Sequence, residues 1–184
     1  MANEYNTNGG ILMSANNIAK EQFEEGMSDF VGGNYDGSIE RFSSALKFDS
    51  NYKPALKGRG AAYLKSNRIP QAIADFDRLI QLDPENARAY HLRGLAHEKS
   101  GEFEKALGDF NYSLEQNPNY GAAYFSRATL HTKMGNTDQA SADMKMVAHL
   151  TEVNIETFAN ENNVWRSQQL RLETMSGDDL AMER

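Results

Sequence analysis

The chain has 184 residues, of which 40% are hydrophobic and 24% are charged, and its formal net charge is −7. Such a composition is typical of a globular domain. The acidic balance argues against nucleic-acid binding, because proteins of that class gather lysine and arginine on one face. The chain contains no cysteine, which excludes a disulfide framework and a thiolate metal site.

Residues 1–18 form the first segment. They are rich in asparagine, almost uncharged and contain Gly9-Gly10, so we expect a flexible N-terminal arm. The segment has no basic stretch followed by a long apolar run, and no run of about 18 apolar residues occurs anywhere in the chain. We therefore expect no signal peptide, no membrane association and a cytoplasmic location.

Residues 19–154 repeat with a period of 34 residues. The segments GRGAAYL, LRGLAHE and SRATLHT begin at residues 58, 92 and 126, and a weaker copy precedes them by one period. The step divides this part of the chain into units 19–52, 53–86, 87–120 and 121–154. Each unit contains two amphipathic stretches of about 14 residues separated by polar residues that include glycine or asparagine, which predicts a pair of helices.

The third unit shows the repeat pattern most completely. At repeat positions 4, 8, 11, 20, 24, 27 and 32 it has Tyr90, Gly94, His97, Ala106, Phe110, Ser113 and Pro118. This pattern resembles the tetratricopeptide repeat (TPR), and the resemblance extends over all four units, the first of which matches least well. The resemblance implies an all-α solenoid in which antiparallel helix pairs stack as a right-handed superhelix.

Opposite charges recur at repeat positions 7 and 23. The later units have arginine at position 7 and aspartate at position 23, whereas the first unit has the reverse signs; these residues are Arg59 and Asp75, Arg93 and Asp109, Arg127 and Asp143, and Glu25 and Arg41. We expect an ion pair between the two helices of each unit, because such a pair tolerates the reversal. The alternative is that the arginines extend to solvent.

Residues 155–176 are predicted to form a C-terminal helix that caps the array, since repeat arrays need a polar outer face at their ends. Ile155 and Phe158 lie on its apolar side. A further apolar stripe either packs back on the array or contacts another chain as a homo-oligomer; it comprises Trp165, Leu170, Leu172 and Met175. Residues 177–184 should be frayed.

Catalytic chemistry is not indicated by any motif in the chain. Gly58 and Gly60 do not form a nucleotide-binding loop, because no strand precedes them and a third glycine is missing. The histidines are interpreted as structural residues rather than metal ligands, because no set of converging ligands accompanies them; they are His91, His97, His131 and His149. We expect no enzymatic activity, no metal and no cofactor.

The TPR resemblance implies that the first helices line an inner groove that binds a protein or peptide partner. The candidate groove residues are Phe23, Met27, Phe30, Lys57, Lys65, Arg88, His91, Leu95, Lys99 and Phe125. They make the groove apolar at its N-terminal end and mildly basic further on, which suits an extended peptide or amphipathic helix with apolar anchors and some acidic residues. Alternatively, residues 1–18 or neighbouring helices cover Phe23, Met27 and Phe30.

One TPR subfamily binds the acidic C-termini of heat-shock chaperones through lysine, asparagine and arginine at set positions. The corresponding residues here are Phe23, Met27, Gly58, Arg88 and Leu92 in one register, and Lys57, Ala61, Leu92, Ala122 and Ser126 in the other. Neither set fits, so we do not expect that mode of binding. The hypothesis is a non-catalytic protein-interaction module, an adaptor or scaffold; the alternatives are a secretion- or assembly-type chaperone and a self-associating scaffold.

Overall fold

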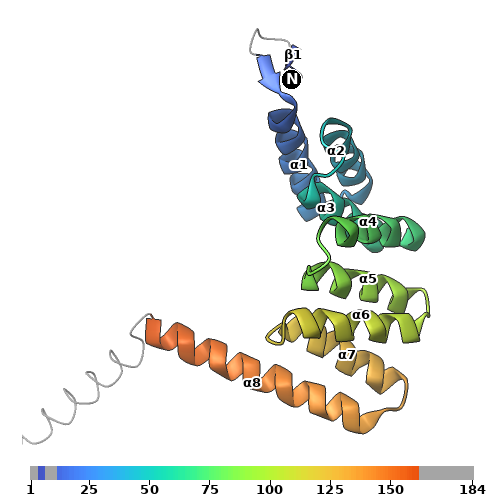
Figure 1. Cartoon of the computed structure of the whole chain (residues 1–184), viewed down its shortest axis with the longest axis vertical. Coiled ribbons are helices and arrows are strands. Elements are labelled where there is room, and N and C mark those ends of the chain that lie inside the picture. Colours follow the sequence, from blue (N-terminus) through green and yellow to red (C-terminus); the bar gives the residue numbers. More distant parts are fainter. Residues whose placement is uncertain (1–3, 7–11, 162–184) are drawn as a thin grey trace, which may run out of the picture.

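A computed structural model describes residues 4–6 and 12–161 of the chain, and eight helices follow one another in tandem over residues 15–161. Figure 1 shows them stacked as hairpins along one axis. Their bounds are α1 Ala15–Val31, α2 Tyr35–Phe48, α3 Lys53–Lys65, α4 Ile69–Leu82, α5 Ala87–Lys99, α6 Phe103–Gln116, α7 Gly121–Lys133 and α8 Thr137–Glu161. The predicted all-α solenoid of TPR hairpins is confirmed.

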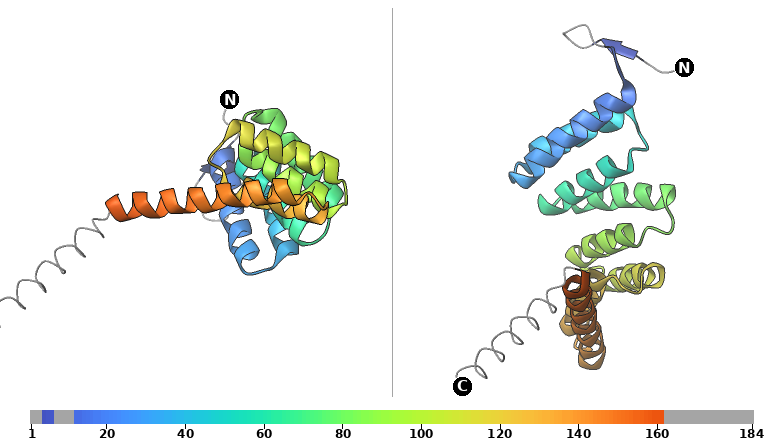
Figure 2. Two further views of the ribbon diagram at one scale, coloured as in Figure 1. Left: turned by 90° about the horizontal axis from the view of Figure 1, so that it is seen from below. Right: turned by 90° about the vertical axis from the view of Figure 1, so that its left-hand side faces the viewer.

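The hairpins stack through alternating helices. The second helix of each unit packs against the first helix of the next, as α2 does on α3, α4 on α5 and α6 on α7. Figure 2 shows α3 and α5 on one side of the stack and α4 and α6 on the other. Consequently α1, α3, α5 and α7 line one continuous face. Within the described part of the chain, no helix combines the length and apolar character needed to cross a membrane.

The N-terminal segment differs from the predicted arm over residues 1–18. Two three-residue strands, β1 Glu4–Asn6 and β2 Leu12–Ser14, pair antiparallel with Glu4 opposite Ser14. Helix α1 then begins at Ala15, because Ile18 and Ala19 are buried and so belong to the packed array. The nearly uncharged composition of residues 1–18 did not reveal that Ile18 belongs to the core, whereas the repeat pattern places Ala19 in the first unit.

A residue with positive φ joins the two helices of every unit. Gly33, Asn67, Gly101 and Gly135 have φ angles of 79°, 63°, 79° and 80°, and all four occupy repeat position 15. The left-handed conformation ends the first helix, and glycine and asparagine adopt it most readily. The polar breakers in the sequence predicted this turn.

Close contact between the two helices of a unit depends on a small residue opposite a phenylalanine. Phe42, Phe76 and Phe110 are completely buried at repeat position 24. Glycine stands opposite at position 8, where a Cβ atom added to Gly94 would lie 2.6 Å from Phe110 Cε1. The phenylalanine ring therefore fills the space that a side chain at position 8 would need.

Replacing Gly94 with alanine should lower the free energy of unfolding by about 1–3 kcal/mol, because Phe110 must leave its place in a close-packed core. Gly108→Ala on α6 is the matched control, since a Cβ there meets nothing within 4 Å. The control should be stabilised by about 0.5–1 kcal/mol, because alanine favours a helix interior over glycine. Urea denaturation followed by circular dichroism measures both, and equal stabilities would contradict the argument.

The C-terminal end of the array corrects one prediction. No separate capping helix begins at residue 155; residues 155–161 continue α8, which is 25 residues long. Glu152 stands at the position of Pro84 and Pro118, which follow the ends of α4 and α6. The first unit also lacks this proline, but α2 ends at Phe48 because a further unit follows it, whereas no further repeat unit of the sequence follows α8. Figure 1 shows the distal part of α8 extending beyond the other helices.

The exposure of α8 fits this extension, because Ile155 is 57% exposed and so does not pack as a cap on the array. The remaining residues of the predicted C-terminal helix lie outside the described part of the chain. They include Trp165, Leu170, Leu172 and Met175. The predicted frayed tail, residues 177–184, also lies outside the described residues.

Candidate partner-binding groove

The arginine–aspartate pairs hold the two helices of each later unit in place. Arg93 donates from Nε to Asp109 Oδ2 at 3.0 Å and from Nη2 to Asp109 Oδ1 at 2.7 Å. Arg59–Asp75 and Arg127–Asp143 have the same two-bond geometry. The three aspartates are buried, so these pairs are largely shielded from water.

The first unit contains its pair with the signs reversed, as the sequence predicts. Arg41 Nη1 lies 2.8 Å from Glu25 Oε2, and both side chains are nearly half exposed. This pair is therefore weaker than its three counterparts, because solvent screens it.

A third bond from each arginine was not foreseen from the sequence. Arg59, Arg93 and Arg127 each donate from Nη1 to a side-chain oxygen of the preceding unit; the acceptors are Ser43 at 3.1 Å, Asp77 at 2.6 Å and Asn111 at 2.7 Å. The sequence did contain a pattern that could have predicted these bonds, because an oxygen-bearing side chain stands 16 residues before each of the three arginines. Hydrogen bonding to the aspartate of its own unit is the main cause that raises the pKa of each arginine above its usual value.

The first part of the groove lies between α1, α3 and α5. Met27 and Phe30 contribute apolar side chains from α1, and Lys57 and Arg88 contribute charges from α3 and α5. Gly58, Ala61 and Leu92 complete its lining. The structure thus brings together four residues that the sequence assigned to the groove.

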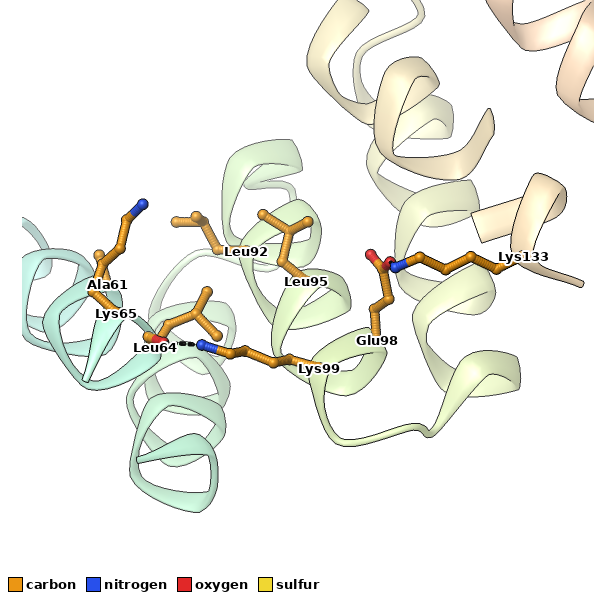
Figure 3. Close-up of a pocket in the computed structure, with 8 residues that line it drawn as sticks. All are labelled: Ala61, Leu64, Lys65, Leu92, Leu95, Glu98, Lys99 and Lys133. Atoms are coloured by element: carbon orange, nitrogen blue, oxygen red, sulfur yellow. Dashed lines mark hydrogen bonds and ion pairs between the residues drawn. The ribbon is translucent and has the colours of Figure 1, made fainter. Parts of the chain in front are cut away.

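The second part of the groove lies between α3, α5 and α7 and shares Ala61 and Leu92 with the first. The predicted residues Lys65, Leu95 and Lys99 line it (Figure 3), so the groove continues along the first helices of all four units. Its remaining lining residues are Leu64, Glu98 and Lys133.

Two of the lysines in this second part are already engaged within the protein. Lys99 Nζ donates to the Leu64 carbonyl oxygen at 3.0 Å, and Lys133 forms an ion pair with Glu98. Figure 3 shows both lysine side chains directed at these partners. The positive charge available to a ligand is therefore smaller than the lysine count of the groove indicates.

Lys57 and Arg88 differ from these lysines. Among the ion pairs and hydrogen bonds of residues 4–6 and 12–161, none involves either side chain. Burial lowers the pKa of the Lys57 ammonium, and the nearby Arg88 charge lowers it further. This corner of the groove thus holds two positive charges with no acidic partner among the described residues.

Phe23, His91 and Phe125 lie outside this continuous groove, although the sequence assigned them to it. Phe23 packs against Phe42 and Tyr52, with ring centroids 5.7 and 5.6 Å apart, and so belongs to the core of the first two units. His91 and Phe125 line a separate pocket, to which α8 contributes Val147 and Leu150. Phe23 and Met27 both belong to α1 but differ in their surroundings. Neighbouring residues cover Phe23, as the alternative interpretation held, whereas Met27 remains exposed.

His91 is a buried link between the third and fourth units. Its Nε2 lies 2.9 Å from Ser126 Oγ, and its Nδ1 lies 3.2 Å from the Tyr120 hydroxyl. Burial, and then the Arg88 charge, lower its pKa to about 4. The ring is therefore neutral at physiological pH and supplies no charge to a ligand.

The other core histidine identified in the repeat is His97, which is buried with Nδ1 2.7 Å from Glu102 Oε2. Within the described residues, no three histidine, aspartate or glutamate side chains gather in a way that could hold a metal ion. The residues that line the groove offer a ligand apolar contact, hydrogen bonds and charge.

Comparisons with known proteins agree with this architecture. The family model described as tetratricopeptide repeat matches residues 60–124. Hsp70-Hsp90 organizing protein 3 of Arabidopsis thaliana is 33% identical over 67 residues, which make up 36% of this chain. Those residues are only 12% of that protein, so the chain spans a small part of its length.

Solved structures share the arrangement of helix pairs. MamA from Desulfovibrio magneticus RS-1 gives a TM-score of 0.68 at 21% identity, covering 73% of this chain and 76% of that one. A thermophilic TPR protein of Thermus thermophilus gives 0.66 at 21% identity, covering 73% and 75%. The first TPR domain of Spaghetti (RPAP3), bound to the HSP90 peptide SRMEEVD, gives 0.62 at 23% identity, covering 65% and 95%. At such identities the likeness establishes the fold alone.

Proposed function

Because the chain is a tetratricopeptide-repeat protein, we propose that it is a non-catalytic interaction module that binds an extended peptide or a partner helix in the groove along α1, α3, α5 and α7. The single observation that carries this proposal is the continuity of the groove. Its two parts share Ala61 and Leu92, so one elongated ligand could contact all four units.

The lining of the groove supports recognition of a polypeptide. Apolar side chains occur along its length, with Met27 and Phe30 at one end and Leu64, Leu92 and Leu95 further on. Charged residues accompany them, an arrangement that is common in grooves that accept the apolar anchors of a helix or an extended segment. The ligand that suits this surface has apolar anchors spaced along its length.

The HSP90 peptide in the RPAP3 structure belongs to that protein and does not identify the ligand of this chain. The residues that occupy the corresponding clamp positions in the first register here include Met27 in place of an asparagine and Leu92 in place of an arginine, so both positions are apolar. We therefore assign the groove to an apolar-anchored partner and not to a chaperone C-terminus.

Blocking the groove at its centre tests the proposal. Ala61→Trp places a large side chain where the two parts meet and should weaken binding of groove ligands at least about 10-fold, which corresponds to about 1.4 kcal/mol. The ligands are taken from a random peptide library displayed on phage and selected on the wild-type protein, and affinities are measured by fluorescence anisotropy.

Ala74→Trp is the matched control, because Ala74 is exposed on α4 and lines neither part of the groove. It should leave binding unchanged, and circular dichroism should show both variants folded. The proposal fails if the wild-type protein selects no peptides, or if Ala61→Trp binds the selected peptides as tightly as the control.

A further inference from the structure

Lys57 and Arg88 form an unusual pair of like charges on neighbouring first helices. Both line the same part of the groove, and the Arg88 charge contributes to lowering the pKa of the Lys57 ammonium. Bringing two cations together costs free energy unless an anion lies between or beside them. The described residues provide no such anion, although the whole chain has 26 acidic residues against 19 basic ones.

Lys99 and Lys133 show that cations of the groove can be paired within the protein, whereas Lys65 resembles Lys57 and Arg88 in taking part in no ion pair or hydrogen bond among the described residues. Lys99 is held by the Leu64 carbonyl and Lys133 by Glu98, so further along the groove those charges are satisfied within the protein. An incoming anion would have to compete with those partners there. At Lys57 and Arg88 it would compete only with water.

The walls beside the two charges are apolar. Met27 and Phe30 contribute to this lining from α1 and Leu92 from α5, and Gly58 of α3 belongs to the same lining. The ring of Phe42 lies beneath Gly58, since a Cβ atom added there would be 2.8 Å from Phe42 Cζ. An apolar group of a ligand can therefore lie directly beside its charged group.

We propose that Lys57 and Arg88 bind one acidic side chain of the partner, an aspartate or glutamate, whose neighbour in the partner is a large apolar residue seated against Met27 and Phe30. The proposal rests on the proposed function above and specifies the class of partner. A single carboxylate matches the site, because its two oxygens accept from the planar guanidinium while the ammonium supplies a further donor. An internal side chain suffices, so the partner needs no free C-terminus at this place.

A displayed library again provides the test. Peptides fused at both ends offer only side-chain carboxylates, and selection on the wild-type protein should enrich aspartate or glutamate beside a large apolar residue. The double variant Lys57→Glu/Arg88→Glu should lose these peptides and enrich lysine or arginine in their place. A selected wild-type peptide should bind the variant at least about 10-fold more weakly.

The control variant Lys47→Glu/Lys145→Glu changes the net charge equally at exposed positions on α2 and α8 that line neither part of the groove. It should select the same acidic peptides as the wild-type protein. Selection of purely apolar peptides by the wild-type protein would overturn this inference and leave the proposed function standing. Selection of no peptides would overturn both.

A second measurement reads the site directly. The Lys57 ammonium pKa, followed by NMR in the presence of a selected acidic peptide, should rise when the peptide binds, because a carboxylate then offsets the Arg88 charge. Binding without any rise would place the peptide carboxylate elsewhere and contradict the inference.

Discussion

The Asp109→Ala protein should unfold with a free energy about 3–5 kcal/mol below that of the wild-type protein, because the change leaves a shielded arginine without its main partner. Arg93 is 23% exposed, while Asp109 is only 8% exposed as a side chain. Of its acidic partners Arg93 then retains Asp77 alone, which is 45% exposed and belongs to the preceding unit. Urea denaturation followed by circular dichroism gives the difference.

Glu25→Ala provides the control within the same molecule. Its partner Arg41 forms the reversed pair of the first unit, where both side chains are nearly half exposed. An exposed pair contributes about 0–1 kcal/mol, so this variant should be almost as stable as the wild-type protein.

A double-mutant cycle isolates the interaction itself. We expect the double variant Arg93→Met/Asp109→Leu to lose much less unfolding free energy than the sum of the losses of the two single variants. A coupling energy near zero would contradict the assignment of this ion pair as a link between α5 and α6.

Acidification from pH 6.5 to pH 4 should remove about 3 kcal/mol of stability through His91 alone. The pKa of His91 is lowered from 6.5 to about 4 in the folded protein, chiefly by burial and then by Arg88. In this window the unfolded chain binds a proton that the folded chain does not, so lower pH favours unfolding. The contribution of His91 to stability is fully present when the pH is above its unfolded-state pKa. It is lost progressively as the pH falls toward its folded-state pKa.

No acidic side chain of the described residues pairs with His91. Tyr120 and Ser126 contact its nitrogens, the Phe110 ring centroid lies 5.8 Å away, and Arg88 opposes a positive charge. Glu102 adds a smaller loss at the acid end of this window, because Lys105 and His97 hold its pKa at about 2 in the folded protein while the unfolded carboxyl titrates near 4.5. His91 is therefore a major source of the expected pH dependence between pH 4 and 6.5.

His91→Gln should flatten the dependence of unfolding free energy on pH in this window, whatever its effect on stability at neutral pH. His149→Gln, a change at an exposed position on α8, should retain the wild-type slope. Urea denaturation at several pH values measures the slopes. Equal slopes for His91→Gln and the wild-type protein would contradict the buried, neutral state of His91.

The period of the sequence predicted the features that repeat within a unit. Glycine or asparagine at position 15 and the opposite charges at positions 7 and 23 act inside one hairpin, where spacing determines contact. The reversal of charge between Glu25 and Arg41 indicated an ion pair before any geometry was known.

Features that depend on contact between units were harder to predict. Lys99 reaches Leu64, Lys133 reaches Glu98 and His91 reaches Ser126, and in each case the residues are 35 apart. The predicted positive groove overlooked these contacts, because a list of lining residues does not show which charges are already satisfied. The ends of the array were predicted least well, since the last second helix has no following unit and no proline to stop it.

The three-way bonding of Arg59, Arg93 and Arg127 gives the array a direction. Each guanidinium extends backward to its predecessor, at Ser43, Asp77 or Asn111, and none extends forward to its successor. Deleting hairpins from the C-terminal side therefore removes a guanidinium together with its bonds and leaves only neutral or half-exposed acceptors. Deletion from the N-terminal side leaves a guanidinium nitrogen without its acceptor at the new end of the array. Shortening the protein from its two ends therefore has unequal consequences.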